Sequence, residues 1–242
     1  RYDDFAKFLV NHSIAVFGHD HRGHGRTEES PSDRGYYGDN ITFDGIVDDM
    51  YKLTEAIKEA HPEKPIFLLG HSMGSFLARR YVQLHSESVN GAILTGSGGN
   101  PGIAGVLGAR IAGLEGRLRG RRKKSFLLNA LTFSAYNKAF RPNRTDFDWL
   151  SRDEAQVDAY IADPLCGEVF TAGFFEEFLK GLNALYDEDQ FIRKDLPVYF
   201  LSGDRDPVGS DTKGVKESCE KLRLHGLSEV EYTFYEGARH EI

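Results

Sequence analysis

The sequence has few cysteines, no excess of basic residues and no long apolar run, and each absence excludes a class of protein. Cys166 and Cys219 are its only cysteines. They match neither a C-x-x-C motif nor the spacing of zinc ligands, which predicts reduced thiols in a cytoplasmic protein. Acidic residues outnumber basic ones by 37 to 30, and the net charge of −7 argues against a nucleic-acid-binding protein. No run approaches the roughly 20 apolar residues of a transmembrane helix.

The chain does contain short apolar runs, and they alternate with longer helical patterns. With 242 residues, 40% of them hydrophobic, it is long enough for one large α/β domain or two small ones. The alternation predicts a mostly parallel sheet with crossover helices. Helical spacing predicts one helix across residues 43–57, ended by His61-Pro62, and another that begins at Ser72. The expected strands, four of which end in glycine, span residues 14–18, 66–70, 92–96, 198–203 and 230–235.

Residues 98–192 interrupt this alternation with several helical patterns and no convincing strand. They predict a helical cap inserted between two parts of an α/β core, residues 1–97 and 193–242. A capping box from Ser151 to Glu154 is expected to open one helix of the cap. An apolar stripe across residues 174–186 predicts another helix, which packs against the core.

The predicted cap also contains an apolar, glycine-rich stretch, residues 101–114, followed by a basic run. One interpretation is a mobile lid that rests on an anionic lipid surface and makes the protein peripheral to a membrane. The other, equally favoured, is a solvated basic loop beside a poorly packed helix. The basic run consists of Arg117, Arg119, Arg121, Arg122, Lys123 and Lys124.

A nucleophile motif lies between an expected strand and an expected helix. Gly70-His71-Ser72-Met73-Gly74 fits G-x-S-x-G, and this strand-to-helix context is the one that the motif requires. We expect the tight turn to expose the hydroxyl of Ser72, and the glycines at 70 and 74 to let neighbouring backbone pack closely. The backbone N–H of Met73 and the start of the helix are predicted to stabilise an oxyanion.

A serine hydroxyl becomes a good nucleophile when a histidine takes its proton and a carboxylate orients that histidine. In an order of serine, acid and histidine, the base follows Ser72. Of the three histidines that do, His85 lies on the helix that Ser72 opens and His225 ends an amphipathic helix. His240 follows the last expected strand, where a loop can return over the strand ends, and is the predicted base.

Two aspartates compete for the role of the acid. Asp204 and Asp206 both follow the strand at 198–203, and parallel sheets bind their ligands at the carboxyl ends of strands. Pro207 biases Asp206 toward an extended conformation that aims its carboxylate outward. Asp204, closer to the turn, is expected to cap it. The prediction therefore favours Asp206.

With Ser72, Asp206 and His240 in this order, the chain resembles the α/β-hydrolase superfamily. Within it, the chain is similar to the monoacylglycerol lipase and lysophospholipase branch, which is grouped with the serine aminopeptidases. The resemblance covers nearly the whole chain and rests on "DHRGHGRT", "GHSMGS", "WLSRDEAQVDAYIADPLC", "SGDRDPVG" and "YEGARHEI". It implies an α/β-hydrolase fold with a cap over a serine triad, and hydrolysis of a lipid-like ester, monoacylglycerol or lysophospholipid, through an acyl-enzyme and without a cofactor.

The sequence departs from this family at both ends. The family has three further strands, and a loop that supplies a second oxyanion donor, before the helix that here reads "RYDDFAKFLV". It also continues into a final helix after the residue that matches His240. Neither is present, so we expect the sequence to be a portion of a longer protein, with the second oxyanion donor outside it.

Three alternatives remain. A prolyl aminopeptidase would hold the free amine of its substrate with carboxylates of the cap, and a non-catalytic hydrolase fold would act as a binding module. A metallohydrolase would use the cluster His19, His21 and His24, although the metal-binding pattern H-x-H-x-D-H has glycine here in place of its aspartate. We expect instead that Asp20 and Arg22 tie this loop down. The cap carboxylates are Asp153, Glu154, Asp158, Asp163, Glu176 and Glu177.

Overall fold

A four-stranded parallel sheet forms the centre of the computed structural model, which describes residues 2–28, 30 and 33–242. The strands pair in sequence order, so each connection between neighbours is a crossover. They confirm four of the five predicted strands, with ends that differ by at most one residue from the expected ones. The strands are β1 (Phe67–His71), β2 (Gly91–Thr95), β3 (Val198–Gly203) and β4 (Val230–Tyr235).

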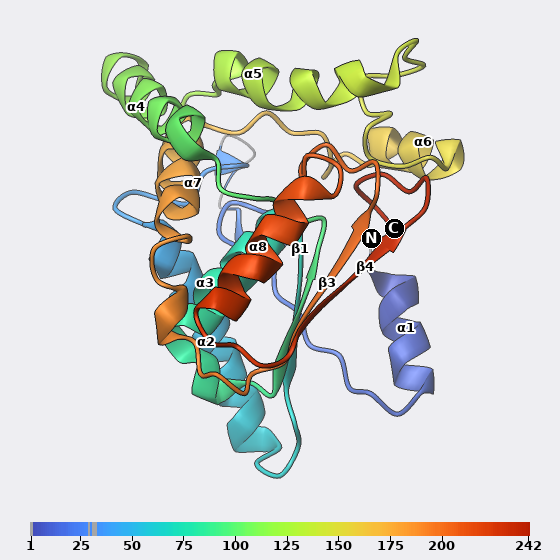
Figure 1. The fold of residues 1–242 in the computed structure, drawn as a ribbon. Helices are drawn as coiled ribbons and strands as arrows, with labels where there is room; N and C mark the ends of the chain where they lie inside the picture. The colour runs from blue at the N-terminus through green and yellow to red at the C-terminus, as the bar shows by residue number, and fades with distance from the viewer. Residues whose placement is uncertain (1, 29, 31–32) are drawn as a thin grey trace.

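Helices make up most of the remaining regular structure. They are α1 (Asp3–Asn11), α2 (Phe43–Ala60), α3 (Met73–His85), α4 (Gly102–Arg119), α5 (Phe126–Asn137), α6 (Glu154–Ala162), α7 (Ala172–Ala184) and α8 (Lys213–Leu224), with short 3-10 turns that include η1 (Gly25–Thr27) and η5 (Asp189–Phe191). In Figure 1, α2, α3 and α8 lie on one side of the sheet and α1 on the other. Helices α4, α5 and α6 lie beyond the ends toward which the arrowheads of β3 and β4 point. The carboxyl ends of these strands therefore face the helices of residues 98–192.

Helix α2 forms where the sequence predicts it. The hydroxyl of Thr42 accepts a hydrogen bond from the N–H of Gly45 and caps the first turn. Most of the predicted apolar stripe is buried, and the helix ends at Ala60, with His61, the residue before Pro62, as its C-cap. The buried residues of the helix are Phe43, Ile46, Val47, Met50 and Thr54.

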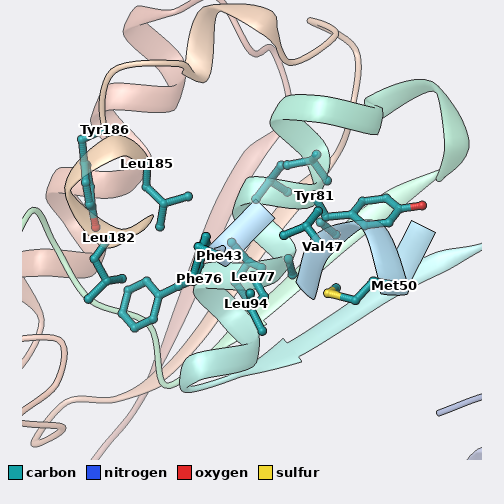
Figure 2. Close-up of a cluster of buried hydrophobic side chains, with 14 of the residues drawn as sticks. Phe43, Val47, Met50, Phe76, Leu77, Tyr81, Leu94, Leu182, Leu185 and Tyr186 are labelled. Carbon is teal, nitrogen blue, oxygen red and sulfur yellow. The ribbon is translucent and has the colours of Figure 1, made fainter. Parts of the chain in front are cut away.

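The main hydrophobic core joins α2 and α3 to the sheet and to the end of α7. Figure 2 shows Leu182 of α7, and Leu185 and Tyr186 just after it, packed with Phe43 of α2 and other core side chains. Full burial of such side chains stabilises a fold by about 1.5–3 kcal/mol each. A Cβ on Gly181 would lie 2.1 Å from the ring of Phe43. The end of α7 is thus docked on the core, as the stripe at 174–186 predicts.

The predicted strand at residues 14–18 is wrong. This segment has no regular secondary structure, no described strand pairs with it, and the side chains of Ile14, Val16 and Phe17 are exposed. An extended segment becomes a strand when a neighbour takes its backbone hydrogen bonds. In the described residues β1 ends the sheet, and residues 14–18 remain outside it.

The segment 98–192 contains α4, α5, α6 and α7 and no strand of the sheet. Its exact limits remain a prediction. The capping box at Ser151 is wrong in detail, because α6 begins at Glu154 and Asp153 is its N-cap, accepting the N–H of Ala155. The hydroxyl of Ser151 instead accepts the N–H of Asp153.

Most residues of the basic run are paired with carboxylates, which neither interpretation of the run predicted. Part of it belongs to the last turn of α4, and four of its six residues have carboxylate partners: Arg119 with Glu115, Arg121 with Glu176 and Glu177, Arg122 with Asp33 and Asp39, and Lys124 with Glu168. Cations paired in this way have less charge to offer an anionic surface. None of the helices in the described part of the chain is long and apolar enough to cross a membrane.

Candidate active site

Ser72 lies in a strained turn between β1 and α3. Its backbone angles are φ 54° and ψ −120°, a region that residues with a side chain rarely adopt. The N–H of Ser72 donates to the carbonyl of Thr95 on the neighbouring strand (2.9 Å). Its own carbonyl accepts from the N–H (2.8 Å) and the hydroxyl (2.7 Å) of Ser75. These bonds hold the strained conformation that G-x-S-x-G predicts for a nucleophile.

The two glycines of the motif differ in how closely other atoms approach them. A Cβ on Gly70 would lie 2.2 Å from the carbonyl oxygen of Gly74 and 2.9 Å from the Cβ of Ala78. A Cβ on Gly74 would meet no atom within 4 Å. Close packing therefore requires glycine at 70 and does not require it at 74, which corrects the expectation for the second position.

Asp206 and His240 form a buried pair at the carboxyl end of the sheet. Their relative exposures are 0% and 2%. Nδ1 of His240 lies 3.0 Å and 3.1 Å from the two carboxylate oxygens of Asp206. A donated Nδ1–H leaves Nε2 unprotonated in the neutral ring, which is the tautomer of a general base. The N–H of Val208 also donates to Asp206 (2.9 Å), whereas Asp204 accepts the N–H of Gly237 (2.8 Å).

Gly96, at the end of β2, lets the two imidazoles beside the nucleophile approach each other. Its φ is +56°, and a Cβ there would lie 2.8 Å from Cε1 of His240 and 2.9 Å from Cε1 of His71. The rings of His71 and His240 are 4.8 Å apart between centroids. No hydrogen bond joins the hydroxyl of Ser72 to His240 in the described part of the chain. Such contacts often tighten only when substrate binds.

Gly203, at the end of β3, makes a second close approach possible. A Cβ there would lie 2.2 Å from the carbonyl oxygens of both Ala238 and Arg239. The loop that carries His240 therefore crosses directly over this strand end. Sequence reasoning assigned no site role to Gly96 or Gly203, although their position at the ends of expected strands is a signal that points to close approach.

The two competing histidines have other surroundings. His85 stacks on Tyr51 with ring centroids 3.9 Å apart. His225 is the residue at the C-terminal end of α8. The structure brings neither of them to Ser72.

The histidine cluster at 19–24 is part of a folded loop. Asp20 accepts the N–H of Arg26 (3.0 Å), and a Cβ on Gly25 would lie 2.6 Å from its carboxyl carbon. His24 is packed near the ring of Phe170. Burial, with the charge of neighbouring histidines second, lowers the pKa of His21 to about 4.

Arg22, the basic residue of this loop, pairs with a carboxylate of α2. Arg22 donates to both carboxylate oxygens of Asp49 on α2 (2.5 Å and 3.0 Å). The expected tie of this loop through Asp20 and Arg22 is confirmed by these hydrogen bonds. Among the described residues, no group of three or more histidine, cysteine or acidic side chains is placed to hold a metal ion.

Aromatic side chains from residues 98–192 cover the imidazole of His240. The ring of Trp149 lies 5.0 Å from it, and Tyr136 of α5 lies 5.2 Å from Trp149. Burial, and after it the charge of Asp206, raises the pKa of Tyr136 to about 12, so the phenol is neutral at ordinary pH. Sequence reasoning gave Trp149 no role, although it is the single tryptophan of the chain and opens one of the quoted motifs.

Comparison with known proteins identifies the family of the chain. The model of the family described as "Serine aminopeptidase, S33" matches residues 1–242. The monoglyceride lipase of Mus musculus is 31% identical over 244 residues, covering 99% of this chain and 70% of that protein. A thermostable carboxyl esterase from Bacillus coagulans has a TM-score of 0.92 at 25% identity, covering 100% of this chain and 78% of that one. A monoacylglycerol lipase from Paleococcus ferrophilus has a TM-score of 0.74 at 22% identity, covering 100% and 81%.

Fold and comparisons together define an α/β-hydrolase that cleaves carboxylic esters with a serine nucleophile. The chain belongs to the serine aminopeptidase S33 family and, within it, to the branch similar to monoglyceride lipases. The predicted fold class and family are confirmed.

Proposed function

We propose that this enzyme hydrolyses the ester of a lipid-like substrate, a monoacylglycerol or a lysophospholipid, with Ser72 as nucleophile, His240 as base and Asp206 as the orienting acid. The observation that carries the proposal is the buried hydrogen bond between Asp206 and His240 beside the strained turn at Ser72. The similarity to the monoglyceride lipase of Mus musculus supports the substrate class.

In this mechanism Nε2 of His240 takes the hydroxyl proton as Oγ of Ser72 attacks the ester carbonyl. The N–H of Met73, at the start of α3, donates to the oxyanion, and one such donor is worth about a hundredfold to a thousandfold in rate. The carbon–oxygen bond to the alcohol breaks as His240 returns the proton to the leaving oxygen. Water, deprotonated by His240, then attacks the acyl-enzyme. As the bond between the acyl carbon and Oγ breaks, His240 returns that proton to Oγ, which releases the fatty acid and free Ser72. No cofactor takes part.

The paired state of the cap carboxylates favours an ester substrate over a peptide with a free amine. Glu176 and Glu177 contact Arg121 and Lys180, and Asp158 contacts Arg144. The other three have partners too: Asp153 caps α6, Asp163 accepts the N–H of Leu165 (2.8 Å), and Glu154 lies 3.7 Å from Arg144. A carboxylate that already holds a cation, as four of these six do, binds a substrate ammonium less strongly.

We further propose that the outer face of the cap contacts the lipid surface from which the substrate is taken. Ile103 and Leu118 of α4 are 87% and 76% exposed, and Phe126 of α5 is 67% exposed. A row of exposed apolar side chains on one helix face is typical of interfacial binding. Because most of the basic run is paired, we expect this contact to depend on apolar residues more than on lipid charge.

A substrate panel tests the catalytic proposal. Wild type, Ser72→Ala and the surface control Ser228→Ala are assayed on monoacylglycerols, lysophospholipids, nitrophenyl esters and prolyl amides, and labelled with a fluorophosphonate. We expect lipid esters to be preferred, and Ser72→Ala alone to lose both turnover and label. Turnover that survives Ser72→Ala contradicts the mechanism, a preference for prolyl amides contradicts the lipid ester, and an unlabelled, inactive wild type favours the binding module.

Vesicle flotation tests the membrane contact. A double variant, Ile103→Gln with Leu118→Gln, is compared with Leu224→Gln, which removes an equally exposed leucine from α8. Neutral phosphatidylcholine vesicles should retain the control and lose the double variant. Equal flotation of the two proteins would place the contact elsewhere.

A further inference from the structure

The loop that carries His240 is hydrogen-bonded to a short stretch of the predicted cap, residues 148–152. The N–H of His240 donates to the carbonyl of Trp149 (3.4 Å), and the N–H of Glu241 donates to the carbonyl of Leu150 (2.7 Å). These bonds run between main chains, so they persist whatever the side chains are. The position of the proposed base is therefore set partly by residues of the 98–192 segment.

Two arginines reinforce the same junction from both sides. Arg152 donates to the carbonyl of Glu236 (2.6 Å) at the start of the loop. Arg239, next to His240, donates to the carbonyls of Asp148 and Ser151. Each side thus contributes one charged donor to the backbone of the other, and charge-assisted bonds of this kind are the stronger ones.

The indole of Trp149 completes the junction by covering the imidazole. Trp149 is 5% exposed, and its ring lies 5.0 Å from that of His240 at an angle of 40°. Phe133 stacks on the indole (6.0 Å) and Tyr136 contacts it at 5.2 Å, so its orientation is fixed by aromatic neighbours. The ring is thus held rigidly against the group that must carry the proton.

The indole has a cost that a phenylalanine would avoid. Its Nε1–H is buried and has no hydrogen-bond partner among the described residues, which is unfavourable for a group that can only donate. Tryptophan also offers the most electron-rich face to a cation. Tryptophan therefore supplies ring surface 5.0 Å from the imidazole of His240, between centroids, rather than a hydrogen bond.

We propose that Trp149 is a positioning residue for the catalytic base: it fixes the imidazole of His240 and stabilises the imidazolium that forms when His240 takes the proton of Ser72. This inference rests on the proposed function. The charged and titratable groups around His240 include the carboxylate of Asp206, the imidazole of His71 and the phenol of Tyr136, which interacts with the charge of Asp206. The guanidinium of Arg239, the residue before His240, points to the 148–152 stretch. Each of these groups is still present in a variant of Trp149.

The test compares Trp149→Leu and Trp149→Phe with Phe147→Leu. The control removes an aromatic ring from the residue just before the 148–152 stretch, and that ring packs on Tyr160. The dependence of kcat and kcat/KM on pH is measured with a nitrophenyl ester, and the folded state of each variant by thermal unfolding. Because the indole favours the charged ring, its loss is expected to move the acid limb of kcat/KM to lower pH.

For Trp149→Leu we expect kcat to fall about threefold to thirtyfold, and the acid limb of kcat/KM to move to lower pH by about 0.5 to 1.5. Trp149→Phe should lie between this variant and wild type, and Phe147→Leu should match wild type. If Trp149→Leu does not fold, Trp149→Phe decides alone, because it retains a ring. A loss of kcat with an unmoved acid limb, or no loss at all, overturns the inference. Failure of the proposed function appears separately, as turnover that survives Ser72→Ala.

Discussion

Replacement of Gly70 by alanine tests the geometry of the nucleophile turn most directly. The new Cβ would lie 2.2 Å from the carbonyl oxygen of Gly74, so backbone must move by about 1 Å to restore ordinary contact. Overpacking of this kind costs about 1–3 kcal/mol. Misplacement of a reacting group by about 1 Å costs about a hundredfold in rate. We therefore expect kcat/KM of Gly70→Ala to fall at least about a hundredfold, together with the free energy of unfolding.

Gly74→Ala is the matched control, because it adds the same methyl group to the same motif. Its Cβ meets no atom within 4 Å, and alanine is favoured over glycine inside a helix by about 0.5–1 kcal/mol. We expect its stability in urea to equal or exceed that of wild type, with fluorophosphonate labelling of Ser72 within about threefold. Equal losses of stability in the two variants, or wild-type labelling of Gly70→Ala, would refute the reasoning.

Three further predictions concern charge, approach and pH. Asp189→Asn leaves the buried guanidinium of Arg79 (2.6 Å) without its counter-charge, so the free energy of unfolding in urea should fall by about 3–5 kcal/mol. Gly96→Ala places a methyl group 2.8 Å from Cε1 of His240, and steady-state assays should show kcat reduced about a hundredfold; an unchanged kcat contradicts the close approach. Burial lowers the pKa of His21 from 6.5 to about 4, so the unfolded chain binds a proton that the folded chain refuses, and stability falls by about 1–3 kcal/mol as the pH drops through that window. Urea unfolding at about pH 7 and about pH 4.5 should show this extra loss in wild type and not in His21→Gln.

Features specified by short stretches of sequence were predictable. The turn at Ser72 follows from five consecutive residues and their strand-to-helix context, and the stripe of α2 from a repeat of a few residues. The segment 14–18 has a comparable apolar pattern and is not a strand, because a strand also needs a neighbour at hydrogen-bonding distance. Periodicity reports which face of a segment is apolar, and it does not report what lies beside that segment.

Features that depend on contacts between distant residues could not be predicted. Gly74 matched the motif as well as Gly70 did, and only the position of Ala78 and of the turn's own backbone distinguishes them. Trp149 and His240 meet because two loops from different parts of the chain exchange hydrogen bonds, which no local pattern encodes. The same holds for the partners of Arg121, Arg122 and Lys124, whose carboxylates lie on three segments far from them in sequence, whereas Arg119 and Glu115 form a local pair one turn apart on α4.

The 98–192 segment is attached to the core at points that also hold the proposed catalytic residues. At its ends, Arg79 of the nucleophile helix α3 pairs with Asp189 and donates to Ser218, whose hydroxyl donates to the carbonyl of Gly98. In its middle, residues 148–152 hold the loop of His240. A displacement of the segment that keeps either junction intact is therefore expected to move the nucleophile or the base along with the helices of the segment. It follows that substitutions in these anchors should change kcat as well as KM, whereas substitutions on the exposed face of α4 should change KM alone.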